Sequence, residues 1–205
     1  MEGMLKRNIV WFSRSARGFS LVDQMLTLGL IATMAAIAVP SLKNTIDGQR
    51  LGMEARNVER EMQLARLSAV TTNRPIRLRF NCPAAGDYRR VELIGSANNP
   101  NTGDDADNRA AVRCNTATYP FPAADSDPIT KPNNDGPKMT LNSKVTFGVG
   151  GTQTLEFWPN GTVHVYNAAA APWPVVGSTP VNIILTSAGV NRSVTVNLLG
   201  KTQIQ

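Results

Sequence analysis

The sequence of 205 residues has one histidine, two cysteines, and aromatic side chains at only 6% of its positions. The histidine, His164, has no adjacent set of serine, cysteine and carboxylate, which argues against nucleophilic catalysis. We therefore expect His164 to be an imidazole on the surface or on an edge strand. The sequence predicts no catalytic residue and no enzyme.

Motifs for binding phosphate or metal are missing as well. The glycine-rich stretch 148–151 has no lysine after it and opens no helical pattern, so it is not a phosphate loop. Asp104, Asp105 and Asp107 could offer oxygen ligands to Ca²⁺, but the glycine and the terminal glutamate of an EF-hand loop are absent. A solvated loop is the favoured interpretation, and the sequence predicts no metal site and no cofactor.

The two cysteines, Cys82 and Cys114, permit one disulfide if this part of the chain is exported. Closing a loop of about 30 residues would stabilise the fold by roughly 3–4 kcal/mol on the chain-entropy argument. Two separate reduced thiols remain the alternative, because spacing along the chain does not show that the cysteines meet in space.

Charged side chains are absent from residues 25–39, an apolar run that follows a basic leader. The leader, residues 1–18, holds four basic residues against one acid, which predicts that it stays in the cytoplasm and that the C-terminal part lies outside. Asp23 stands at the start of the apolar run. A carboxylate there is costly in a bilayer, so its presence needs a functional reason.

The order of Gly18, Phe19, Asp23, the apolar run and Pro40 resembles the N-terminus of type IV prepilins. The resemblance implies that a prepilin peptidase cuts after Gly18 and methylates the new amine on Phe19. It also implies that Asp23, where the family usually has glutamate, faces the Phe19 amine of a neighbouring subunit during assembly. Pro40 then occupies a position at which pilins commonly carry proline.

Two other interpretations of the apolar run stay open. The first is a secretory signal peptide that is cut after residues 36–38, which read Ala-Ile-Ala. The second is a simple single-pass anchor, although 15 uncharged residues are few for a span of about 20. Only the prepilin interpretation explains Gly18, Phe19, Asp23 and Pro40 together.

Helical periodicity continues beyond the apolar run. Apolar residues recur at spacings of four, three, four, three and four, which places them on one face of a helix. They are Leu51, Ala55, Val58, Met62, Ala65 and Ala69. The pattern stops before Pro75. We expect one helix from residue 19 to about residue 71, bent or loosened around Pro40, with a membrane and assembly segment at 19–42 and an amphipathic segment at 43–72.

The remainder, residues 76–205, favours strands. The candidates are residues 76–80, 91–94, 145–149, 155–158, 163–166, 181–186 and 193–199. In 76–80 apolar and basic residues alternate, so we expect one buried and one wet face. Asn160-Gly161 favours a hairpin between two candidates. The predicted fold class is α+β, a long helix packed on an antiparallel sheet, with a loop at 95–140 that is either functional or partly disordered.

Three further stretches, residues 63–78, 155–163 and 194–201, resemble the GspH/FimT family of minor pseudopilins and minor pilins. The resemblance implies a structural filament subunit of a type II secretion pseudopilus or a type IV pilus, at the tip or in priming. It implies a single-pass inner-membrane protein whose domain, residues 43–205, is periplasmic before it joins the filament. The implied partners are other pilin subunits, the prepilin peptidase, the inner-membrane assembly platform and the bilayer.

DNA binding is the alternative function. Some members of the family serve in DNA uptake and carry a glycine-arginine-x-arginine motif near the C-terminus, of which Gly200-Lys201 keeps one basic residue. Several arginines could add a basic stripe that contacts phosphates. The candidates are Arg74, Arg77, Arg79, Arg89, Arg90 and Lys201.

Overall fold

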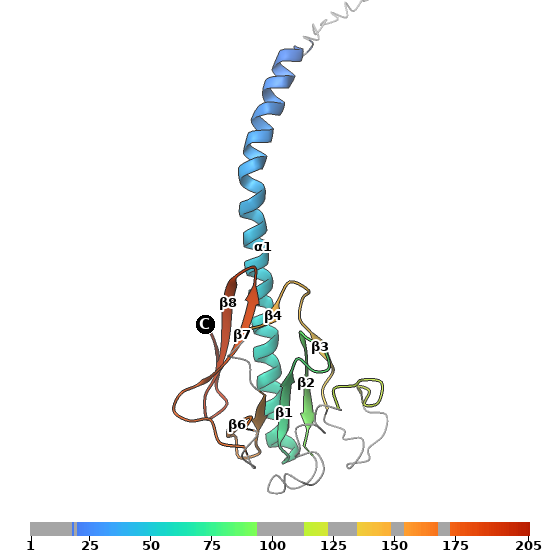
Figure 1. Ribbon diagram of the computed structural model, residues 1–205, viewed down its shortest axis with the longest axis vertical. Coiled ribbons are helices and arrows are strands. Elements are labelled where there is room, and N and C mark those ends of the chain that lie inside the picture. Colours follow the sequence, from blue (N-terminus) through green and yellow to red (C-terminus); the bar gives the residue numbers. More distant parts are fainter. Residues whose placement is uncertain (1–17, 19, 94–112, 123–134, 149–153, 168–172) are drawn as a thin grey trace, which may run out of the picture. The chain divides into compact units, whose positions relative to one another are not determined.

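The computed structural model describes residues 18, 20–93, 113–122, 135–148, 154–167 and 173–205 (Figure 1). These residues form one long helix, α1 (Leu21–Thr72), and nine short strands whose pairings are antiparallel. The predicted α+β fold class is confirmed. The chain divides into two compact units, residues 1–43 and 44–205, and each is described here by itself.

The strands form two sheets, where the sequence predicted one. The first sheet has the order β3-β2-β1-β5-β6 and the second has the order β4-β7-β8-β9. The strands of the first are β1 (Ile76–Phe80), β2 (Asp87–Glu92), β3 (Met139–Thr140), β5 (Leu155–Phe157) and β6 (Val163–Val165). Those of the second are β4 (Thr146–Phe147), β7 (Val181–Ser187), β8 (Val190–Val196) and β9 (Thr202–Ile204).

The strands were predicted unevenly: β7 extends one residue beyond the predicted 181–186, whereas β2 begins at Asp87, four residues before the predicted strand 91–94. β1 has the predicted bounds, and β5 and β6 form the predicted hairpin, in which Gly161 has a φ of 84°. β3 and β9 were not predicted, because two or three residues give no periodicity. β8 begins at Val190 rather than at residue 193, directly after Ala188 and Gly189. Both of these residues have positive φ, as in the tight turns that suit a twisted hairpin.

The amphipathic stripe of α1 is confirmed as the buried face of the helix in the second unit. Its six predicted residues are all buried, and they share one core with apolar side chains of both sheets. Leu78 and Phe157 come from the first sheet, and Ile183 and Val194 from the second. Burying a leucine or valine of this kind contributes about 1.5–3 kcal/mol relative to exposing it. Figure 1 shows the strands alongside this part of α1.

α1 ends within one residue of the predicted position. Asn73 follows the last helical residue with a φ of 53°, the left-handed conformation in which helices commonly stop. Pro75 then cannot continue the helix, and β1 starts at the next residue. This short connection fixes where the first sheet begins relative to the buried stripe.

Candidate functional site

The first part of α1 exposes apolar side chains along its whole length. Residues 20–43 are all exposed in the described chain, and the large apolar ones include Leu26, Ile31 and Ile37. α1 is long and apolar enough to cross a membrane, and it fits a single-pass anchor. Such a surface needs lipid or other protein to cover it.

Asp23 lies in the first turn of α1. Ser20 occupies the N-cap position, and its carbonyl accepts a hydrogen bond from the backbone N–H of Gln24 at 3.2 Å. A negative charge at this end of a helix is favoured by the helix dipole. No ion pair of Asp23 exists within the described residues. Gly18 is exposed and Phe19 lies outside the described residues, so cleavage, methylation and the pairing of Asp23 with Phe19 stay predictions.

Pro40 lies inside α1, and the helix continues on both sides of it. Proline has no N–H, so it cannot donate to the carbonyl of Ala36 one turn earlier. Pro40 therefore marks the position in the anchor where the backbone hydrogen bonds are interrupted.

Cys82 and Cys114 are joined by a disulfide across a sequence separation of 32, with Cα atoms 5.4 Å apart. Cys82 follows β1 by two residues, and Cys114 lies in the short described segment 113–122. The bond ties that segment to the turn between β1 and β2. The structure thus resolves the choice between a bridge and two thiols that spacing alone left open.

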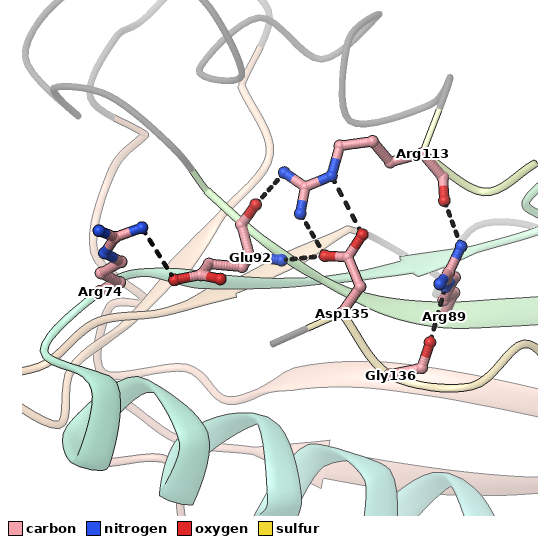
Figure 2. A network of polar contacts seen from close by, with 6 residues as sticks. All are labelled: Arg74, Arg89, Glu92, Arg113, Asp135 and Gly136. Atoms are coloured by element: carbon pink, nitrogen blue, oxygen red, sulfur yellow. Dashed lines mark hydrogen bonds and ion pairs between the residues drawn. The ribbon is translucent and has the colours of Figure 1, made fainter. Parts of the chain in front are cut away.

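An ion pair between Arg113 and Asp135 lies next to the disulfide (Figure 2). The Nη2 and Nε groups of Arg113 donate to the two carboxylate oxygens of Asp135, and Nη1 donates to the carbonyl of Glu92. The backbone N–H of Glu92 also donates to Asp135, at 2.8 Å. Burial raises the pKa of the Asp135 carboxyl above its ordinary value, although the Arg113 guanidinium opposes this shift.

Arg89, on β2, joins the same network from inside the sheet. Its Nε donates to the carbonyl of Gly136 at 2.7 Å, and its Nη1 donates to the carbonyl of Arg113 at 2.6 Å. Burial lowers the pKa of the Arg89 guanidinium, an effect that nearby Asp135 opposes. Together with the ion pair, Arg89 holds residues 113–122 and the chain from Asp135 onward against β2. These are the described parts of the predicted loop 95–140; Asp104, Asp105 and Asp107 lie outside the described residues.

The expectation of a wet face on β1 was wrong. Arg77 is only 2% exposed, and its Nη2 donates to Glu156 of β5 at 2.8 Å. The indole ring of Trp173 covers the guanidinium, with 3.9 Å between Cζ and the ring centroid. Trp173 comes from the connection between β6 and β7, so the polar face of the sheet is buried by a segment distant in sequence.

His164 lies on an edge strand as expected, but it is not on the surface. It is 6% exposed, and its Nδ1 is 2.6 Å from the carbonyl oxygen of Trp173. Its ring stacks on Trp158 at a centroid distance of 4.5 Å. Trp158 in turn donates from Nε1 to Glu156 at 2.7 Å. His164 therefore helps to hold the segment that contains Trp173. Among the residues that the structure describes, no group of three or more potential metal ligands occurs.

The candidate DNA-binding residues do not form one exposed cationic stripe. Arg77 and Arg89 are buried, and Arg90 pairs with Glu61 at 2.7 Å. Arg74 is exposed but pairs with Glu92 at 3.2 Å. Arg79 is partly buried, whereas Lys201 is exposed. Most of these positive charges thus serve internal contacts of the domain.

The network of Arg113 and Asp135 was missed in the sequence. Asp135 lies in an Asn-Asn-Asp-Gly stretch that reads as a turn, and Arg113 has only its neighbour Cys114 to suggest a fixed position. A possible disulfide at Cys114 was the single available signal that this part of the loop is tied down.

The family model described as type II transport protein GspH matches residues 54–200. This match covers the second part of α1 and the strands up to β8. No curated protein and no solved structure matches the chain. The matched family consists of structural pseudopilins rather than enzymes, which agrees with the exposed apolar helix. The chain belongs to the GspH family of type II transport proteins.

Proposed function

We propose that this protein is a minor pseudopilin or minor pilin. It would be held in the inner membrane before assembly and would then join an envelope filament, either at the filament tip or when filament assembly is primed. The observation that carries the proposal is that the single helix α1 continues past Pro40 from an exposed apolar segment into the domain that the GspH family model matches. Such a helix can be held by lipid before assembly and by other subunits afterwards. The domain, residues 43–205, would be periplasmic.

Processing would prepare the helix for assembly. The basic leader would stay in the cytoplasm, and the prepilin peptidase would cut after Gly18 and methylate Phe19. The absence of a Cβ on Gly18 suits a backbone that must lie in a narrow active site. The assembly platform would then receive a helix whose first turn carries Asp23.

Asp23 would pair with the Phe19 amine of a neighbouring subunit. Away from water, opposite charges attract strongly, and a carboxylate without a partner is heavily disfavoured. The pair would therefore set the register of neighbouring helices. Aspartate is one methylene shorter than glutamate, so the neighbouring helix has to approach more closely.

DNA uptake is the weaker candidate. Its support was a stripe of arginines, and Arg77 is instead buried in an ion pair with Glu156. Lys201 remains exposed but stands without the second arginine of the family motif. A gel shift with duplex DNA at two salt concentrations tests this function, and absence of a shift at low salt excludes it.

N-terminal sequencing of the mature protein tests the proposed function. We expect Phe19 as the first residue in cells that contain the prepilin peptidase, and the full leader in cells that lack it. Gly18→Leu should block cleavage because its side chain obstructs the active site, whereas Ser20→Ala is the matched control. A mature chain that begins at Val39 would instead identify a secretory signal peptide.

A further inference from the structure

The second sheet has an open edge at β9. β9 is the last strand in the order β4-β7-β8-β9, and among the described residues it has a neighbouring strand on one side only. Gln205 and Ser193 of β8 exchange both of their backbone hydrogen bonds, at 2.8 and 3.1 Å. In an antiparallel pair such residues alternate with residues whose N–H and C=O groups point away from the partner strand. Thr202 and Ile204 are residues of this second kind, so their backbone groups point away from β8.

α1 holds this edge in place. The Oγ1 of Thr202 donates to Glu59 at 3.1 Å and accepts from Nε2 of Gln63 at 3.3 Å, and Ile204 packs against the hydrophobic core. The side chains of both strand residues thus face the domain, while their outward backbone groups have no backbone partner among the residues that the structure describes. A fixed strand with such unpaired groups is a template for pairing with another extended segment.

Exposed cations flank the β9 edge. Arg56 and Arg60 each stand three residues before one of the two helix residues that Thr202 contacts, so they lie on the same side of α1. Lys201 directly precedes β9. All three cations are exposed, and none has an ion-pair partner within the described parts of the chain. The edge therefore carries positive charge that the domain itself does not neutralise.

A pocket of about 460 Å³ lies beyond the Gln205 end of this edge. Arg192, which precedes the β8 residue that pairs with Gln205, lines the pocket together with Arg56. The Nη1 of Arg192 lies 3.6 Å from the place that a Cβ on Gly52 would take, so its guanidinium group reaches the helix. A strand that runs along β9 would place a side chain here, where two guanidinium groups suit a carboxylate.

The chemistry of this surface selects its occupant. Unpaired N–H and C=O groups on a strand require an extended chain, and the cations around them require acidic side chains. A second copy of this protein that offered its own β9 would bring another Lys201 to an edge that is already positive. Like charges on neighbouring strands are destabilising, and a lysine at an edge is a common protection against self-pairing. The surface therefore favours a partner that differs from this chain.

We propose that the β9 edge binds an extended acidic segment of another protein by strand addition. The added strand donates to the carbonyls of Thr202 and Ile204 and accepts from their N–H groups. Its acidic side chains meet Arg56 and Arg60, and one of them enters the pocket at Arg192. This surface goes beyond the filament role and requires only that the domain is folded.

Fluorescence anisotropy of a labelled peptide tests the proposal, with the full chain in neutral detergent as the receptor. The peptide alternates valine with glutamate, and its control alternates valine with lysine. We expect only the glutamate peptide to bind. Arg56→Gln and Arg60→Gln should each weaken its binding about three-fold, and the double variant about ten-fold, as is typical of exposed ion pairs. Lys144→Gln removes an exposed cation beside β4, at the opposite edge of the same sheet, and should change nothing.

Backbone pairing can be tested separately from charge. A glutamate peptide that is methylated at alternate backbone nitrogens keeps its charges but cannot donate to the strand, so we expect it to bind about ten-fold more weakly. The unmethylated peptide should slow hydrogen exchange at the amides of Thr202 and Ile204, which a purely electrostatic contact would not do.

Equal binding of the glutamate and lysine peptides would overturn the proposal, as would unchanged hydrogen exchange at Thr202 and Ile204 in the peptide complex. Binding of duplex DNA without any binding of the glutamate peptide would identify a nucleic-acid site instead. Self-association that the double variant abolishes, again without binding of the peptide, would show that the occupant is a second copy. Cleavage before Phe19 tests the pseudopilin role independently of all these results.

Discussion

Arg113 donates to both carboxylate oxygens of Asp135 in a buried contact that spans 22 positions of the sequence. The pair connects two segments of the long excursion between β2 and β3 and holds both against β2 through Glu92 and Arg89. The base of this excursion is therefore a fixed part of the domain. Its stability depends on the charges of Arg113 and Asp135, which are both buried and neutralise each other.

Removing the charge of Asp135 should strongly destabilise the domain. Asp135→Asn leaves Arg113 buried without a counterion, and we expect a loss of about 3–5 kcal/mol in the free energy of unfolding of the full chain in detergent. Asp47→Asn is the matched control, because the partly exposed pair of Asp47 with Arg50 is worth at most about 1 kcal/mol. Similar losses in the two variants, measured by chemical denaturation, would contradict the structural role of the pair.

The disulfide should stabilise the domain because it closes a loop and so restricts the unfolded chain. Cys82→Ser with Cys114→Ser removes a cross-link over a sequence separation of 32. We expect a loss of about 3–4 kcal/mol in unfolding free energy. Mass analysis without reductant should find no free thiol in the exported protein. Detection of two free thiols, or an unchanged denaturation midpoint after reduction, would count against the bond.

Local patterns in the sequence predicted the parts of the fold that depend on neighbours along the chain. The stripe from Leu51 to Ala69 was identified correctly because a helix repeats every 3.6 residues whatever it packs against. Arg77 was misjudged for the opposite reason. Its burial depends on Trp173, almost a hundred residues later, and no pattern within residues 76–80 contains that information. The pairing of Arg113 with Asp135 was likewise hidden, because each lies in a stretch of turn-forming composition.

Tyr88 should make the domain sensitive to alkaline pH. Burial raises the pKa of its hydroxyl above the ordinary value near 10, and the charges of Glu54 and Glu61 add to the shift. Above about pH 10 the unfolded chain releases a proton that the folded chain keeps, so stability is complete below that pH and falls as the pH rises. The expected slope approaches about 1.4 kcal/mol per pH unit.

In thermal melts of the full chain, stability should decline between pH 9 and pH 11. Tyr88→Phe should remove the part of this decline that comes from the Tyr88 hydroxyl. Tyr166→Phe is the matched control, since Tyr166, the residue directly after β6, is exposed. If both variants lose stability with pH as steeply as the unmodified protein, then the alkaline transition does not come from Tyr88.

A substitution at Arg77 tests whether this arginine stabilises the domain or binds DNA. Arg77→Gln leaves Glu156 buried without its ion pair and takes the cation from the ring of Trp173. We expect a loss of about 3–5 kcal/mol in unfolding free energy and a changed tryptophan emission. Arg60→Gln should leave both unchanged. A stable Arg77→Gln protein that loses affinity for duplex DNA would instead support the DNA-uptake alternative.

Asp23 should control entry into the filament rather than folding of the domain. Asp23→Ala removes the carboxylate that would meet the Phe19 amine of a neighbouring subunit. We expect this variant to be cleaved normally and to remain in the membrane. Its amount in the sheared filament fraction should fall at least about ten-fold. Asp23→Glu should retain incorporation because the family usually has glutamate there, and Gln24→Ala is the uncharged neighbouring control. The melting temperature of the domain should be the same in all three variants, since Asp23 lies in the first unit. Normal incorporation of Asp23→Ala would mean that the apolar surface of the anchor is sufficient for assembly and that the carboxylate has another purpose.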